Sequence, residues 1–177
     1  MRRFLDRLYD WSGAFAAICL AGICVMMLAQ AFGREAGILV RGAEDITAWL
    51  CAASAFFALG HTFRHGELVR VGLWLERLGP RGRRIMELFA LGLTTIFVAY
   101  MLWAVGRFIF ESWKFNEVAQ GVIRVPIWIP QLSLVFGIGI FLVAVIDELV
   151  TVIKREKPSY QRAEEARAAA GDFSEKL

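Results

Sequence analysis

The feature that most limits how this chain can fold is a set of long runs without a charged residue. Residues 12–33 form an uncharged run of 22 residues, residues 88–106 one of 19, and residues 125–146 one of 22. A helix needs roughly 20 apolar residues to cross the hydrocarbon core of a bilayer, which is about 30 Å thick. The runs show no sustained alternation of the kind that barrel strands have. They therefore predict three transmembrane helices.

A fourth predicted span is shorter. Residues 46–60 are uncharged for 15 residues before His61, and they reach spanning length only with Thr62 and Phe63. Small residues recur along this segment at helical spacing, and such a stripe lets another helix approach closely. Its members are Ala48, Cys51, Ala52, Ala55 and Ala58. The stripe predicts a packing face, more readily for a helix of the same chain than for a partner, and leaves both open.

We therefore predict an all-α integral membrane protein with four spans, at residues 12–33, 44–63, 86–108 and 125–147. The composition agrees, with 58% hydrophobic and 21% charged residues, whereas a soluble domain is near half apolar and a quarter charged. It argues against a secreted or cytosolic enzyme. The net charge of +3 reflects loop charges in a chain of this class and does not indicate nucleic-acid binding.

The residues that could hold a metal or form disulfides give no pattern for either. Cys19, Cys24 and Cys51 lie in apolar blocks and are interpreted as small buried residues. His61 and His65 have the i,i+4 spacing of a metal pair, but no third ligand follows at a useful spacing. Both histidines also share one segment, which excludes a bis-His haem between two helices. We predict no catalytic residue, no metal and no cofactor.

The distribution of Lys and Arg predicts the orientation. Fifteen of the twenty fall in residues 1–11, in residues 64–84 and after residue 146, and five fall in the two remaining connections. Because cationic loops resist translocation, both termini are expected in the cytoplasm. Five tryptophans near segment ends fit interfacial anchoring: Trp11, Trp49, Trp74, Trp113 and Trp128.

Three further segments complete the organisation. Residues 67–78 are mostly apolar with a few charges and predict an interfacial helix in the cytoplasmic loop. The membrane domain is expected to cover residues 1–157, followed by a charged cytoplasmic tail at residues 158–177. A cleavable signal ending at Ala29-Gln30-Ala31 is a competing interpretation of the first span, but its apolar stretch exceeds the 7–15 residues usual for a signal.

Charged residues are confined to span ends, where they can cap helices, pair or bind lipid. Glu44 and Asp45 precede the second span and would complement the positive end of its helix dipole. Asp147 and Glu148 end the fourth span and are expected to meet solvent or basic neighbours. No ionisable residue lies at the centre of a span, where it would indicate an ion or substrate pathway.

The order of these features resembles the small permease subunit of tripartite ATP-independent periplasmic (TRAP) transporters over residues 5–155. Members carry an acidic pair before the second span, here Glu44-Asp45, and a basic Gly-Glu motif after it. The motif is Arg64-His65-Gly66-Glu67-Leu68-Val69-Arg70-Val71-Gly72-Leu73, in which Leu68 and Gly72 replace the family's His and Asp. Pro126-Ile127-Trp128 fits a Pro-x-Trp sequence before the fourth span.

The resemblance implies an accessory subunit of the bacterial inner membrane. Its partners would be a large transport subunit, and a periplasmic solute-binding protein acting through the assembled complex. The transporter would take up an organic acid with a sodium gradient. The resemblance and the charges together suggest partner-interface residues, namely Glu44, Asp45, Arg64, Gly66, Glu67, Arg70 and Trp128. Membrane lipids are expected at the inner loop.

Two other classes were compared. A small multidrug exporter also has four spans but needs an acidic residue within the first, and residues 12–33 contain none. The alternative that stays open is a membrane anchor for a soluble redox or signalling subunit.

Overall fold

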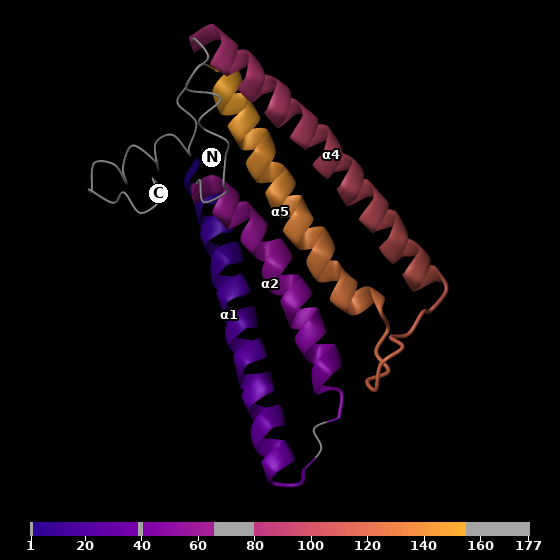
Figure 1. Ribbon diagram of the computed structural model, residues 1–177. Helices are drawn as coiled ribbons and strands as arrows, with labels where there is room; N and C mark the ends of the chain where they lie inside the picture. Colours follow the sequence, from indigo (N-terminus) through magenta and orange to yellow (C-terminus); the bar gives the residue numbers. More distant parts are fainter. Residues whose placement is uncertain (1, 39–40, 66–79, 155–177) are drawn as a thin grey trace, which may run out of the picture.

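The computed structural model describes residues 2–38, 41–65 and 80–154. It contains the helices α1 (Arg2–Glu35), α2 (Ala43–His65), α4 (Pro80–Lys114) and α5 (Trp128–Ile153) (Figure 1). All four are long and apolar enough to cross a membrane. The described ranges contain no strand, only an isolated bridge between Val118 and Pro126. The predicted all-α class with four spanning helices is confirmed, whereas the interfacial helix at residues 67–78 lies outside the described residues.

The helices extend beyond the predicted spans, and local sequence explains where they end. The 34 residues of α1 are about 51 Å long, well over the thickness of a hydrocarbon core. Its end is a Schellman motif, in which Ile38 N–H donates to Gly33 O and Gly37 adopts φ +70°. α4 begins at Pro80, which needs no intrahelical N–H partner there. α5 begins at Trp128, later than the predicted span, because Pro126 pairs with Val118.

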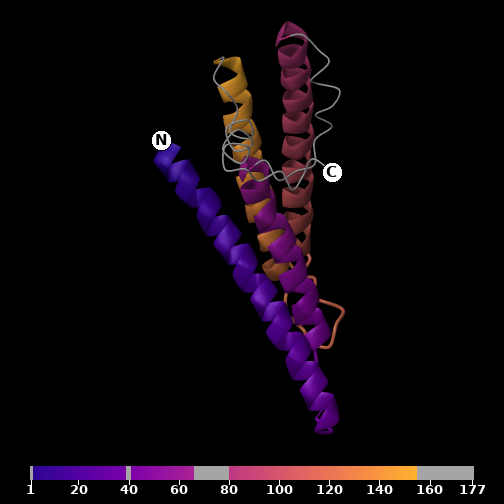
Figure 2. The ribbon, with the colours of Figure 1, turned by 60° about the vertical axis from the view of Figure 1, so that its left-hand side comes forward.

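The helices pack in the order α1, α2, α5, α4, so that α2 and α5 are central and α1 and α4 lie at the edges (Figure 1). α1 tilts away from the other three and touches α5 only slightly (Figure 2). The start of α1 and the ends of α2 and α5 share one end of the molecule, here called the Arg64 end. The α1–α2 turn and the 115–127 loop share the other, here called the Asp45 end. The four helices thus form an open row rather than a closed bundle.

Two glycines bring the central helices together. A Cβ on Gly137 of α5 would lie 2.6 Å from Phe56 Cβ and 2.8 Å from Phe56 O on α2. A Cβ on Gly60 of α2 would lie 2.9 Å from Ile140 Cγ2 on α5. The sequence does not distinguish Gly137 from Gly139, two residues later. Only the structure shows that a Cβ on Gly139 would have nothing within 4 Å. The contact between α2 and α5 therefore depends on one glycine from each helix.

The small-residue stripe of α2 is not where the chain packs on itself. Ala48, Cys51 and Ala55 are exposed, and only Ala52 and Ala58 are half-buried. The predicted preference for packing within the chain is therefore wrong. The buried positions Ala53, Ser54 and Gly60 lie on other sides of the helix, and Gly60 packs against Ile140 of α5. The stripe faces away from α1 and α5 because α2 sits between them in a single row.

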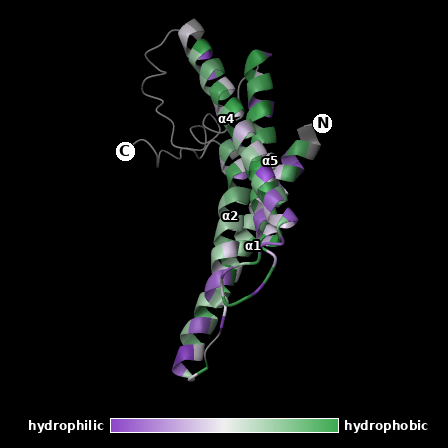
Figure 3. Ribbon diagram, turned by 90° about the vertical axis from the view of Figure 1, so that its right-hand side faces the viewer, coloured by the Kyte–Doolittle hydropathy of each residue, from purple (hydrophilic) through white to green (hydrophobic). Residues whose placement is uncertain are grey.

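Apolar residues cover most of the helical surface (Figure 3). The buried cluster is small and joins Tyr9 of α1 to residues of the other helices: Phe63, Leu91, Ala144, Val145 and Val152. Large apolar side chains elsewhere are exposed, for example Trp11, which is 76% exposed, and Phe97, which is 67% exposed. Apolar surface on this scale needs lipid or a protein partner to cover it.

Candidate functional site at the two ends of the helices

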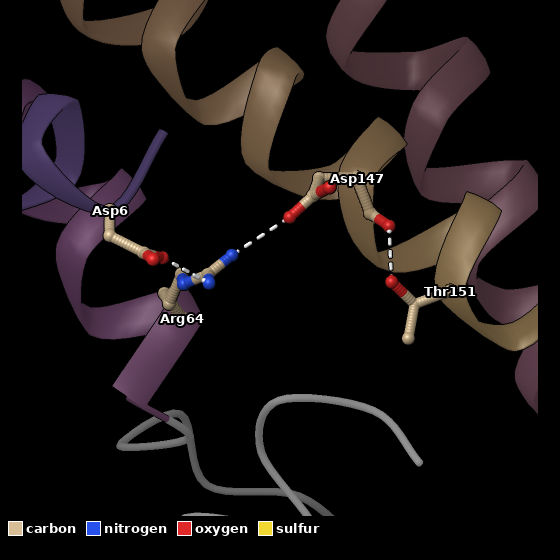
Figure 4. A network of polar contacts seen from close by, with 4 residues as sticks. All are labelled: Asp6, Arg64, Asp147 and Thr151. Carbon is tan, nitrogen blue, oxygen red and sulfur yellow. Dashed lines mark hydrogen bonds and ion pairs between the residues drawn. The ribbon is translucent and has the colours of Figure 1, made fainter. Parts of the chain in front are cut away.

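The Arg64 side chain joins three helices. Its guanidinium donates to Asp147 Oδ2 of α5 at 2.8 Å and to Asp6 Oδ1 of α1 (Figure 4). It also lies over the ring of Tyr9, 5.1 Å from the centroid. The Arg64 side chain is 20% exposed and that of Asp147 is 22% exposed, so water screens this pair only in part. One residue at the end of α2 thus fixes α1 and α5 on either side.

Polar contacts between α1 and α2 continue beside this cluster. Ser12 Oγ donates to Phe57 O at 2.6 Å, and His61 Nδ1 lies 3.3 Å from Tyr9 O. A Cβ on Gly13 would lie 2.8 Å from the His61 ring, so this glycine makes room for the imidazole. His61 is therefore held within the α1–α2 contact.

The end of α5 is also fixed by α4. Arg84 Nη2 donates to Ile153 O at 3.1 Å, one of the carbonyls left without an intrahelical partner at a helix C-terminus. Thr151 Oγ1 donates to the Asp147 carbonyl at 2.9 Å (Figure 4). Glu148 is only 3% exposed. Of the two surroundings expected for Glu148, solvent is excluded, because α5 continues to Ile153 and Glu148 is buried.

Asp45 organises the opposite end. Its Oδ2 accepts a hydrogen bond from Ile123 N–H at 3.2 Å, which ties the 115–127 loop to the first turn of α2. The carboxylate lies directly against Gly121, and Ile123 lies against Gly42, which has φ +79°. A side chain at either glycine would collide with these groups. The first turn of α2 and the loop thus fit together through two glycines.

The loop itself is ordered by its own hydrogen bonds. Ala119 N–H donates to Val125 O at 2.9 Å and Ile127 N–H donates to Glu117 O at 3.0 Å. Ser112 Oγ donates to Glu117 Oε2 at 2.9 Å, joining the loop to the end of α4. Phe115, Val118 and Val122 are exposed on this loop, at 53–68%.

The predicted interface residues fall into three groups. Arg64 and Asp45 are engaged within the chain, at opposite ends of α2. Glu44 is exposed and Trp128 is half-buried at the start of α5, so the structure does not bring the seven together. Gly66, Glu67 and Arg70 lie outside the described residues.

The cysteines differ in their environments. Cys19 is buried, but Cys24 and Cys51 are exposed on the faces of α1 and α2 that turn away from neighbouring helices. The interpretation of all three as buried is therefore wrong for two of them. The residues that the structure describes contain no group of three or more His, Cys, Asp and Glu side chains that could hold a metal.

Sequence reasoning missed the partners of Arg64. The sequence predicts solvent or a basic neighbour for Asp147 without identifying Arg64, and it indicates no role for Asp6. A signal existed, because Asp6, Arg64 and Asp147 all flank spans at the end predicted to be cytoplasmic. Opposite charges at one membrane end are candidates for pairing, but the sequence does not say which helices are neighbours.

Comparison with protein families decides the identity of the chain. The model of the DctQ component of tripartite ATP-independent periplasmic transporters matches residues 23–155, well over half of the 177 residues. The chain belongs to the DctQ family. It is thus the small membrane component of a TRAP transporter and a multi-pass membrane protein, and DctQ is a family of transporter components rather than of enzymes. No curated protein and no solved structure matched the chain.

Proposed function

We propose that this DctQ-family protein is an accessory subunit that holds a large transport subunit in the bacterial inner membrane. The complex would take up an organic acid with a sodium gradient, after a periplasmic solute-binding protein delivers the acid. The observation that carries the proposal is the family match combined with the open row of helices. A chain that leaves so much apolar surface uncovered is suited to binding another membrane protein.

The four described helices lack the features that coupled transport uses. Substrate and ion sites in secondary transporters lie near the bilayer midplane, where discontinuous helices or ionisable side chains supply ligands. The four described helices are continuous, and their charged residues lie toward their ends. Transport is therefore assigned to the partner, and a fixed support is assigned to this chain.

We infer that the exposed stripe of α2 is the surface that meets the large subunit. Ala48, Cys51 and Ala55 let another helix approach closely, and they are exposed among the helices that the structure describes. Glu44 is exposed in the first turn of the same helix and can contribute a polar contact there. Arg64 and Asp45 would support the interface indirectly, because they fix the neighbours of α2. The remaining predicted interface residues are still candidates for contact with the large subunit, namely Trp128, Gly66, Glu67 and Arg70.

The orientation follows from the cationic residues. Both termini would be cytoplasmic, which puts the Arg64 end inside and the Asp45 end in the periplasm. The 115–127 loop would then be on the side from which the solute-binding protein arrives.

Purification from native membranes in mild detergent tests the proposal. We expect a large multi-pass membrane protein to copurify, and Ala55→Trp to reduce its yield because the indole prevents close approach. Ala99→Trp is the matched control, since Ala99 is exposed on α4 at the edge of the row. Copurification of a soluble redox or signalling subunit instead would support the anchor alternative. Equal yield from both variants would remove the stripe from the interface.

A further inference from the structure

Two cavities are lined by successive parts of α2, beginning near the Asp45 end. The first has a volume of about 280 Å³ and lies between the end of α1, the start of α2 and the 115–127 loop. The second has a volume of about 390 Å³ and lies further into the predicted membrane, between α1, α2 and α5. Asp45 lines the first and Ile46 lines the second, so consecutive residues of α2 line the two cavities.

The first cavity carries both signs of charge. Arg34 of α1 and Arg41 of the turn line it, and neither forms an ion pair within the described part of the chain. Glu44 lines it as well, while Asp45 is already occupied by the Ile123 N–H. The two guanidinium groups suit a phosphate. The Glu44 carboxylate suits an ammonium group beside it.

The second cavity is an apolar groove that extends only part of the way across the predicted membrane. Nearly all of its lining is apolar or aromatic, including Trp49 near the start of α2 and Phe57 further along. From Ile46 to Phe57 the α2 axis rises about 16 Å. That distance is about half of a 30 Å hydrocarbon core, which is the depth of one leaflet. A partner helix would need a groove through the whole core, whereas an acyl chain of one leaflet needs this length.

We propose that the two cavities together bind one zwitterionic phospholipid of the phosphatidylethanolamine type. Its phosphate lies between Arg34 and Arg41, its ammonium group faces Glu44, and one acyl chain fills the groove. The lipid belongs to the leaflet at the Asp45 end, which is the periplasmic leaflet under the proposed topology. Bound there, it joins the second half of α1 to α2 and α5.

Native mass spectrometry of the full-length chain, delipidated in detergent and incubated with defined lipids, tests this site. We expect about one dioleoyl phosphatidylethanolamine per chain to be retained. The double variant Arg34→Ala/Arg41→Ala should lower retention by about tenfold, because it removes both phosphate contacts. Arg107→Ala/Lys114→Ala is the matched control and should retain lipid like the wild type, since these cations lie on α4. The binding assay depends on neither the topology nor the transport partner.

A second variant and two other ligands keep the test decisive. Ile129→Trp places an indole in the groove at a position that is 45% exposed, so the fold should tolerate it while retention falls. Phosphatidylglycerol, which has no ammonium group, and diacylglycerol, which has no headgroup charge, should both bind more weakly. Equal retention of diacylglycerol, equal retention by the Arg34→Ala/Arg41→Ala variant, or no retained lipid at all would overturn the proposal.

Discussion

At the residue scale, Arg64 is the most informative position. Sequence similarity suggested a contact with a partner, but the structure gives its guanidinium two carboxylates and an aromatic ring within the chain. A pair that is about one-fifth exposed lies between the surface and buried cases, so neither full Coulomb energy nor full screening applies. Its role is to keep α1 and α5 in place against α2.

Replacing Arg64 by Ala should therefore lower the stability of the fold. We expect the free energy of unfolding to fall by about 1–3 kcal/mol, because Asp147 loses its partner while still three-quarters covered. Unfolding by denaturing detergent in mixed micelles measures this change. Arg107→Ala is the control, since its ion pair with Glu111 is exposed and should cost at most about 1 kcal/mol.

A double-mutant cycle separates the ion pair from general damage. If Arg64 and Asp147 interact directly, Arg64→Ala/Asp147→Ala should be less destabilised than the sum of the two single variants. Additive losses would contradict the pair as a source of stability.

At the element scale, the contact between α2 and α5 depends on glycine. Gly137 touches the backbone of Phe56, so even a methyl group must push the helices apart. We expect Gly137→Ala to lower the free energy of unfolding by about 1–3 kcal/mol, as overpacking does in other cores.

Gly139 provides the comparison, because it lies on the same helix with nothing within 4 Å of its Cβ position. Gly139→Ala should be neutral or stabilise by up to about 1 kcal/mol, through the better helix propensity of alanine. Equal effects of the two substitutions, followed by the same detergent titration, would show that packing against Phe56 is not the cause.

The four helices could be predicted from the sequence, but their neighbours could not. Uncharged runs identify helices because the bilayer sets their length. The same sequence favoured an internal contact for the small-residue stripe and left a partner contact open, and the structure leaves its members Ala48, Cys51 and Ala55 exposed. In a sequence, a stripe of small residues looks the same whether or not a helix of the chain covers it. The packing order α1, α2, α5, α4 decides which helix faces are covered. The pairing of Arg64 with Asp147, 83 residues apart, depends on the same order.

At the scale of the whole molecule, the open row implies a subunit rather than an independent transporter. Its helices carry apolar residues on both broad faces, and its charged clusters lie at the two ends. The start of α1 and the end of α5 share one end of the molecule, so both face the same side of the membrane. Locating one of them therefore fixes the orientation of the whole row.

A reporter fused after Leu177 tests that assignment. We expect activity only from a reporter that works in the cytoplasm, because 15 of the 20 cationic residues fall in residues 1–11, in residues 64–84 and after residue 146. A fusion in the 115–127 loop should give the opposite signal. A periplasmic signal after Leu177, or a mature N-terminus at Phe32, would contradict the topology.

The central claim is that this chain supports transport without performing it. Sodium-driven uptake into proteoliposomes tests it most directly, using this chain alone, its large partner alone, or both, each with the cognate solute-binding protein. Because the four described helices are continuous and carry their charged residues toward their ends, we predict uptake only when both membrane subunits are present. Uptake by this chain alone, or full uptake by the large partner alone, would contradict the account.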